Sequence, residues 1–257
     1  MARDAKDFAI AAAVNNHEIL EACLKRSPDL VSGALQLKIY ENYPSAALAL
    51  NAALDGAEAP IAILAHQDVY LPAGWLDRLA RQIDLVEQKS PNWAVVGLYG
   101  REPDGAEVGL VWSSGLGRVL GHPGFEPTEV VTLDELVLIV RKDSGLRFDE
   151  GVPGFHFYGT DIVMQGRVNG APSFVVEAPA IHNGRPVKSL SGAYAVGYRY
   201  MQRKWRRHLP LKNLSSDIVW HPVKLWRAQW AGVRRYRNNV NRPRPDAVEV
   251  AKRLNYE

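Results

Sequence analysis

Residues 60–77, PIAILAHQDVYLPAGWLD, contain the pattern that decides the fold. An apolar run ends at His66-Gln67-Asp68, and a short loop then leads to an amphipathic segment that starts at Trp75. Continuous apolar runs are typical of strands that helices cover on both faces of a parallel sheet. The stretch therefore predicts a strand, a loop and a helix, with polar residues at the carboxyl end of the strand.

Similar patterns recur along the chain. Helical periodicity predicts helices over 17–26, 45–57, 75–89 and 159–169, and apolar runs predict strands over 8–14, 35–41, 60–65, 93–98, 129–141 and 172–180. Glycine is frequent between 97 and 127, where hairpins or loops are expected. The alternation predicts an α/β fold with a mostly parallel central sheet and helices on both faces.

Composition excludes several classes of protein. The chain has 257 residues, 47% of them hydrophobic and 23% charged, which is a globular composition and not that of a disordered or collagen-like chain. Its single cysteine, Cys23, cannot form an internal disulfide, so we expect an inert core thiol and a cytoplasmic protein. No glycine-rich phosphate loop, CxxC pair or His-Glu-x-x-His occurs, which counts against dehydrogenases, NTPases and zinc enzymes.

Charge divides the chain into two parts. Residues 199–245 contain thirteen Lys and Arg and a single acid, Asp217, for a net charge of +12, whereas the remainder carries −9. We therefore place a boundary at Pro186, between an α/β domain over 1–186 and a basic helical extension over 187–257.

Four tryptophans, Trp205, Trp220, Trp226 and Trp230, lie among these bases. One interpretation is an interfacial segment on the inner face of an anionic membrane. A second is that the helices pack their tryptophans on the body and expose solvated arginines. Nucleic-acid binding would use the same residue types but is the weakest of the three interpretations.

Polar residues follow the predicted strands, and ligands of open α/β sheets bind at the carboxyl ends of strands. Asp68 follows the third strand and His182 follows the last one. A carboxylate and an imidazole, together with phosphate oxygens, would form an octahedral site for Mn²⁺ or Mg²⁺. The structural alternatives are a turn aspartate and a hydrogen-bonded core histidine.

The succession FAIAAAVNN, SAALALNAAL, IAILAHQDVYLPAGWLDRL, FDEGVPGFHFYGTDIVM and IHNG resembles the nucleotide-sugar glycosyltransferases of the GT-A fold, family 2. It is most similar to the StrF-type domain group of streptomycin biosynthesis, and the resemblance covers residues 7–185. It implies metal-dependent, inverting transfer of a hexose from a nucleotide-diphosphate sugar to an acceptor hydroxyl. It also implies a place in cell-surface polysaccharide biosynthesis.

The resemblance also implies roles for particular residues. Asp68 and His182 would hold the metal ion, and Asp161 would be the general base that takes the proton from the acceptor. His66 stands where relatives carry the first carboxylate of Asp-x-Asp, and we expect it to contact the donor. Asp161 also has a structural interpretation, since aspartate near the start of a helix is a common cap.

Asn15 and Asn42 follow the first two strands, and we expect them to bind the nucleotide base unless they are ordinary turn asparagines. One rival function is a sugar-nucleotide pyrophosphorylase, although residues 13–17 lack its glycine-rich loop. The other rival is a catalytically silent protein that keeps the fold and binds carbohydrate or a membrane surface.

Overall fold

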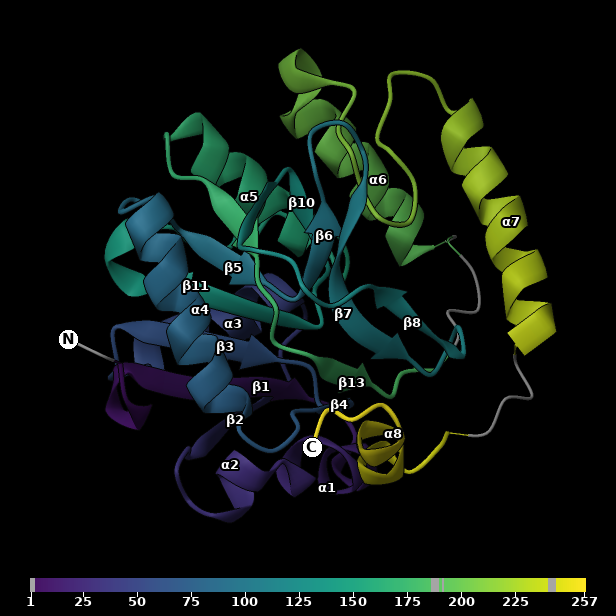
Figure 1. Cartoon of the computed structure of the whole chain (residues 1–257). Helices are drawn as coiled ribbons and strands as arrows, with labels where there is room; N and C mark the ends of the chain where they lie inside the picture. The colour runs from purple at the N-terminus through teal and green to yellow at the C-terminus, as the bar shows by residue number, and fades with distance from the viewer. Residues whose placement is uncertain (1–2, 186–189, 191, 240–243) are drawn as a thin grey trace.

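The computed structural model describes residues 3–185, 190, 192–239 and 244–257. Its largest sheet has seven strands in the order β2-β1-β3-β11-β5-β12-β9 (Figure 1). β9 and β11 run antiparallel to their neighbours, and the other five strands share one direction. These strands are β1 (Phe8–Val14), β2 (Leu37–Glu41), β3 (Ile61–Ala65), β5 (Val95–Gly97), β9 (Thr128–Val130), β11 (Val137–Arg141) and β12 (Ser173–Val175). The predicted α/β fold with a mostly parallel sheet is confirmed.

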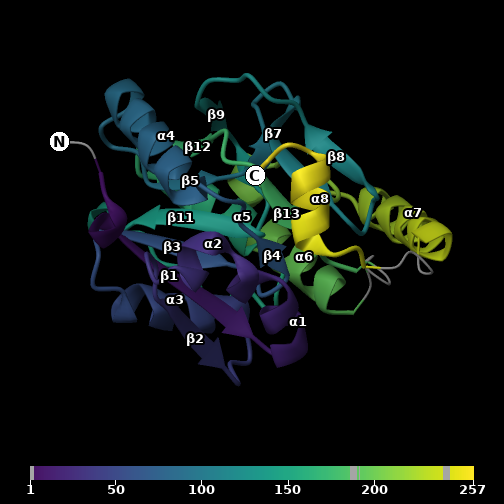
Figure 2. The same ribbon diagram turned by 60° about the horizontal axis from the view of Figure 1, so that its bottom comes forward.

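Helices cover both faces of this sheet (Figures 1 and 2). α3 (Ala46–Gly56) and α5 (Tyr158–Val168) pack on one face. α1 (His17–Ala22) and α4 (Trp75–Lys89) pack on the other, and the short α2 (Pro28–Val31) lies next to them. The apolar stripe of α4 is fully buried. Each buried Leu or Ile side chain contributes about 1.5–3 kcal/mol to the stability of the fold, relative to an exposed one.

A second sheet has six strands and contains the predicted hairpin region. It comprises β4 (Val69–Tyr70), β6 (Tyr99–Arg101), β7 (Glu107–Ser113), β8 (Arg118–Gly121), β10 (Thr132–Leu133) and β13 (Ala180–His182). Two predicted strands are therefore wrong in extent, because 129–141 forms three strands and 172–180 is divided between the two sheets. Pro179 separates β12 from β13, since proline has no N–H to donate to a strand ladder.

The C-terminal part of the chain divides into docked and exposed helices. α6 (Ala193–Lys204) buries Tyr198 and Met201 in a core that it shares with α5, and α8 (Ala247–Arg253) packs on β13. α7 (Val223–Asn239) lies at the edge of the molecule (Figure 1). The predicted boundary at Pro186 lies outside the described residues. In the part of the chain that the structure describes, no helix is both long and apolar enough to cross a membrane.

Candidate nucleotide and metal site

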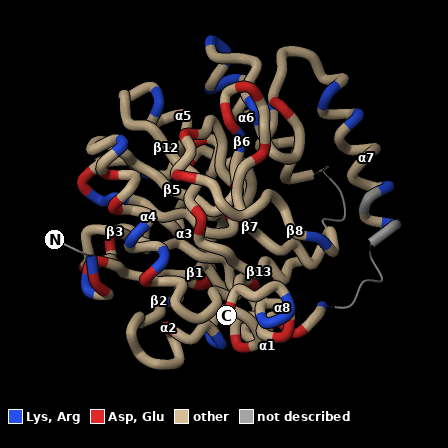
Figure 3. Tube along the Cα trace, viewed as in Figure 1, with Lys and Arg blue, Asp and Glu red and all other residues tan. Residues whose placement is uncertain are grey.

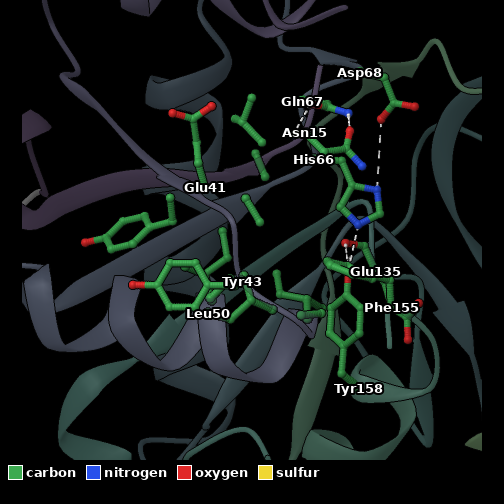
Figure 4. A pocket seen from close by; sticks show the side chains of 18 of the residues that line it. Asn15, Glu41, Tyr43, Leu50, His66, Gln67, Asp68, Glu135, Phe155 and Tyr158 are labelled. Atoms are coloured by element: carbon green, nitrogen blue, oxygen red, sulfur yellow. Dashed lines mark hydrogen bonds and ion pairs between the residues drawn. The ribbon is translucent and has the colours of Figure 1, made fainter. Parts of the chain in front are cut away.

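A cleft of about 540 Å³ opens at the carboxyl ends of β1, β2 and β3 (Figure 4). Its walls combine small apolar residues of α3 with aromatic and polar side chains from the strand ends. These include Asn15, Tyr40, Glu41, Asn42, Tyr43, His66, Gln67, Asp68, Glu135 and Tyr158. Open α/β sheets bind ligands at this edge, and the volume suits a cofactor-sized molecule.

Gln67 ties the ends of β1 and β3 together. Its Oε1 accepts hydrogen bonds from the backbone N–H groups of Asn15 and Asn16, both at 3.0 Å, and its Nε2 donates to Asn15 Oδ1 at 2.6 Å. Asn42 lies across the cleft with a φ of 63°, a left-handed conformation that asparagine tolerates better than most residues. Both predicted asparagines therefore reach the cleft, although Gln67 already occupies the side-chain oxygen of Asn15.

His66, Asp68 and His182 form one cluster, and one ligand atom of each lies within 4.8 Å of the others. Asp68 Oδ1 is 3.5 Å from His182 Nε2 and 4.0 Å from His66 Nδ1. The antiparallel pairing of β13 with β4 places His182 opposite Val69. His182 thus reaches Asp68 through the second sheet, which corrects its predicted place at the end of a central strand.

Gly184 lies beside this cluster and leaves room for an ion. A Cβ added to Gly184 would lie 3.0 Å from His182 Nε2 and 3.2 Å from Asp68 Oδ2, so a larger residue would fill the space next to both ligands. Two imidazoles and a carboxylate with free coordination positions suit a divalent transition metal ion, so Mn²⁺ fits this set better than Mg²⁺, which prefers oxygen ligands.

The cluster combines charged and neutral groups. Burial alone would raise the pKa of Asp68, but the facing His182 holds that pKa well below its usual range. Burial alone would lower the pKa of His182, yet the Asp68 carboxylate raises it to about 9. Burial lowers the pKa of His66, which is therefore a neutral imidazole at pH 7. A divalent cation between these residues would take the place of the His182 proton.

Tyr158 orients His66 (Figure 4). The Tyr158 hydroxyl donates to the backbone oxygen of Glu135 at 3.4 Å and lies 2.6 Å from His66 Nε2. In the tautomer that carries the proton on Nε2, His66 donates to this hydroxyl. The lone pair of His66 Nδ1 then faces Asp68, as in the outer shell of a metal site.

Glu135 lies where the cleft adjoins a second, smaller hollow of about 60 Å³. Its carboxylate accepts from the backbone N–H of Gly159 at 3.1 Å, in the first turn of α5. A Cβ at Gly159 would approach Glu135 Cγ to 2.9 Å, so glycine permits this close approach of helix and carboxylate. Burial raises the pKa of Glu135 to about 8.

Arg244 brings a positive charge from the C-terminal segment to the cluster. Its charge lowers the pKa of Asp68 and also acts on that of His182. Its buried Nε has no hydrogen-bond partner in the described part of the chain. The charge of this guanidinium beside a candidate metal site would attract an anionic ligand.

Asp161 does not line the cleft. Its side chain is only 1% exposed, and its oxygens accept hydrogen bonds from Trp205 Nε1 at 2.7 Å, Lys204 Nζ at 2.8 Å and Gln165 Nε2 at 2.8 Å. The position of Asp161 therefore does not fit the base role that the resemblance implies. The carboxylate instead joins α5 to the end of α6.

The sequence gives no local reason to assign a role to Tyr158 or Arg244. In the stretch TLDEL over 132–136 it leaves two interpretations of Glu135, a residue near the acceptor or, in preference, a solvated charge at a strand edge. The strand prediction over 129–141 concealed the break that turns Glu135 inward. Gly159, directly after Tyr158, was a local sign that another segment approaches the backbone closely at this point. No local sign marked Arg244, because only the return of the chain toward α8 brings it to the site.

Comparisons with known proteins give limited similarity. No protein-family model matches the chain. One curated relative, "ATP synthase subunits region ORF 6" of Fuscovulum blasticum, is 28% identical over 153 residues, 58% of this chain and 60% of the relative. The chain thus matches less than two thirds of that relative's length.

Several solved structures are similar to this chain. Mannosyltransferase PcManGT from Pyrobaculum calidifontis, in complex with GDP-Man and Mn²⁺, is 13% identical with a TM-score of 0.49, covering 100% of this chain and 82% of that one. S. aureus TarS 1–349 with UDP-GlcNAc is 15% identical with a TM-score of 0.48, covering 90% and 73%. GalNAc-T7 with UDP, GalNAc and Mn²⁺ is 12% identical with a TM-score of 0.46, covering 93% and 58%. Because these TM-scores are below 0.5, the similarities assign no function to the chain. Its function has to be inferred from the geometry of its own site.

Proposed function

We propose that this chain is a metal-dependent glycosyltransferase of the GT-A type, which moves a hexose from a nucleotide-diphosphate sugar to an acceptor hydroxyl. One observation carries the proposal. A cleft of nucleotide size at the carboxyl ends of β1, β2 and β3 has the His66–Asp68–His182 cluster beside it. Nucleotide and metal sites that adjoin in this way are what a diphosphate donor requires, because the ion has to reach both phosphates.

The nucleoside would bind at the end of the cleft away from the metal cluster. Tyr40 and Tyr43 line that end with ring centroids 6.3 Å apart, and either ring offers an aromatic face to the base. Asn42 offers the donor and acceptor groups of its side-chain amide to the base. Asn15 also lies in the cleft, where hydrogen bonds to Gln67 hold its backbone N–H and its side-chain oxygen in place.

The diphosphate would then lie beside Asp68. His66 Nδ1, an Asp68 oxygen and His182 Nε2 are the protein groups that would hold the ion, and Arg244 would neutralise further phosphate charge. Bound Mn²⁺ or Mg²⁺ supplies positive charge that stabilises the departing nucleoside diphosphate.

Glu135 takes the base role in this proposal. It lies between the donor cleft and the hollow in which Asp134 and His156 also lie, and an acceptor hydroxyl can enter from that side. The Glu135 carboxylate accepts the hydroxyl proton while the hydroxyl oxygen bonds to the anomeric carbon. The nucleoside diphosphate leaves with the electrons of the broken C–O bond. A single displacement of this kind inverts the anomeric centre.

A sugar-nucleotide pyrophosphorylase would have to bind a nucleoside triphosphate, and the loop after β1 does not suit the phosphates. The backbone N–H groups of Asn15 and Asn16 donate to Gln67, and the N-terminus of α1 is capped by the Asn16 side chain, which accepts from Ile19 N at 3.0 Å. Three N–H groups that could face a phosphate here are therefore occupied, whereas phosphate-binding loops present free ones.

A thermal-shift screen of UDP-, GDP- and dTDP-sugars, with Mn²⁺ and with excess chelator, tests the proposal. Ligand at 100 times its Kd stabilises a fold by about 2.7 kcal/mol, so we expect one nucleotide to raise the melting temperature with Mn²⁺ only. Asp68→Ala should abolish this shift, whereas Asp143→Ala on the surface should keep it. Equal shifts with metal and chelator, or no shift with any nucleotide, would contradict the proposal.

A further inference from the structure

The outward side of α7 is an apolar stripe that no described residue covers. Val223, Trp226, Trp230 and Val233 follow one another at spacings of three, four and three residues, which places them on one side of a helix. Trp226 is 62% exposed and Trp230 is 70% exposed, and both valines are exposed as well. We call these four residues the outer stripe of α7.

The opposite side of α7 holds the helix to the body. Leu225 is buried in the core of α6, Gln229 donates to the backbone oxygen of Leu190 at 3.1 Å, and Gly232 lies against the Leu190 side chain. Because this side already has its partners, the outer stripe cannot turn inward without breaking them. The stripe therefore has no partner among the described residues and is available to an external surface.

Basic residues flank the stripe. α7 contains five Lys and Arg and no acidic residue, and Figure 3 shows blue positions along it and no red ones. Lys224 pairs with Asp217, but Arg227, Arg234 and Arg237 have no ion pair within the described ranges. Figure 1 places the helix at the edge of the molecule, where a flat surface can reach it.

We propose that α7 docks this protein on an anionic membrane surface, with the outer stripe in the headgroup region and the arginines at the lipid phosphates. Tryptophan beside arginine on one side of a helix is the pattern of interfacial helices, since the ring enters the headgroup layer and the charge stays near phosphate. A helix of 17 residues is roughly 26 Å long, enough to lie along the surface with both tryptophans inserted. A flat anionic bilayer can contact the stripe and its arginines together, whereas a protein partner would need an acidic groove shaped to the helix. The charge pattern therefore matches an anionic bilayer better than an acidic protein groove. Docking would bring the enzyme to a lipid-linked acceptor, but it does not depend on the transferase activity.

Vesicle binding tests the docking directly. The full chain is mixed with vesicles of 30% phosphatidylglycerol in phosphatidylcholine or of phosphatidylcholine alone, and sedimentation and tryptophan emission are measured. We expect binding and a blue shift with the anionic vesicles only. Binding should weaken as salt rises, because exposed charges are screened beyond about 10 Å at 0.1 M.

Matched variants separate the stripe from general charge. Arg227→Gln with Arg234→Gln should weaken vesicle binding about 30-fold, since each base near the surface contributes about fivefold. Trp226→Ala with Trp230→Ala should weaken it at least about tenfold. Val31→Ala with Leu85→Ala removes exposed apolar groups from the body, and Arg81→Gln with Arg167→Gln removes two body charges; both pairs should bind as the parent does.

Three results would overturn the inference. They are no binding at low salt, equal binding to neutral vesicles, and binding that the control pairs lower as much as the α7 variants do. Tighter salt-sensitive binding to single-stranded DNA than to anionic vesicles would assign α7 to nucleic acid instead. Asp68→Ala should bind vesicles normally, so a failed transferase and a failed docking surface remain distinguishable.

Discussion

Asp68 and Asp161 are two carboxylates of low exposure beside cationic or ionisable partners, and the structure uses them in opposite ways. Asp68 faces a cleft, with two imidazoles 3.5 and 4.0 Å away and open space beside Gly184. Asp161 faces the protein interior, where Lys204, Trp205 and Gln165 occupy its oxygens. A carboxylate whose coordination is complete stabilises the fold, whereas one with free positions can bind a ligand.

The largest effect is expected at the open carboxylate. Asp68→Asn removes the charge that would hold the ion but keeps the backbone oxygen that accepts from Asn183 N. Metal charge stabilisation is worth several kcal/mol, so sugar transfer should fall about 10³-fold or more. Transfer is measured with the donor found by the screen. Asp143→Asn should change nothing, and an active Asp68→Asn variant would remove the distinction between the two carboxylates.

Glu135→Gln should lower kcat about 10²–10⁴-fold and leave nucleotide affinity unchanged, because the amide cannot take a proton. Only the ionised carboxylate is active, and burial raises its pKa to about 8. The parent rate should therefore rise with pH through about 8 and then level off. Glu129→Gln, on the exposed edge of the same segment, is the matched control. A normal rate in Glu135→Gln would assign the base elsewhere.

Asp161→Asn should act on stability. The change removes the buried charge that accepts from Lys204 and Trp205, whereas Lys204 keeps its ion pair with Asp149 at 2.6 Å. We therefore expect the free energy of unfolding to fall by about 2 kcal/mol, as for the loss of hydrogen bonds to a charged group. Urea unfolding measures this, and calorimetry should find unchanged nucleotide affinity. If the variant instead keeps its stability and loses transfer, Asp161 is the base that the family resemblance implies.

The smallest effect is expected at Arg244. Arg244→Gln should weaken binding of the nucleoside diphosphate about tenfold, as for the loss of one charge-assisted hydrogen bond of about 1.5 kcal/mol. Binding of the nucleoside alone should not change. Arg253→Gln is the control, since that guanidinium stacks on Trp112 at 5.1 Å. Equal losses in both variants would show that α8 stability is involved, and not phosphate contact.

The sequence predicted what short-range patterns determine. The helices α3 and α4 and the place of Asp68 after β3 follow from periodicity and residue type, and the structure confirms each. The environment of Asp161 could not be predicted, because its partners Lys204 and Trp205 come from a helix whose docking no local pattern specifies. Glu135 and Arg244 likewise depend on contacts between distant segments.

The most direct test of the account is a Mn²⁺ titration followed by electron paramagnetic resonance, with and without the nucleoside diphosphate from the screen. Free Mn²⁺ gives a sharp six-line signal that is lost on binding. The account predicts that the parent chain with nucleotide binds one Mn²⁺ per chain, and that Asp68→Asn and His182→Ala bind none, while Asp161→Asn binds as the parent does. No bound Mn²⁺ in the parent, or undiminished binding in Asp68→Asn, would contradict it.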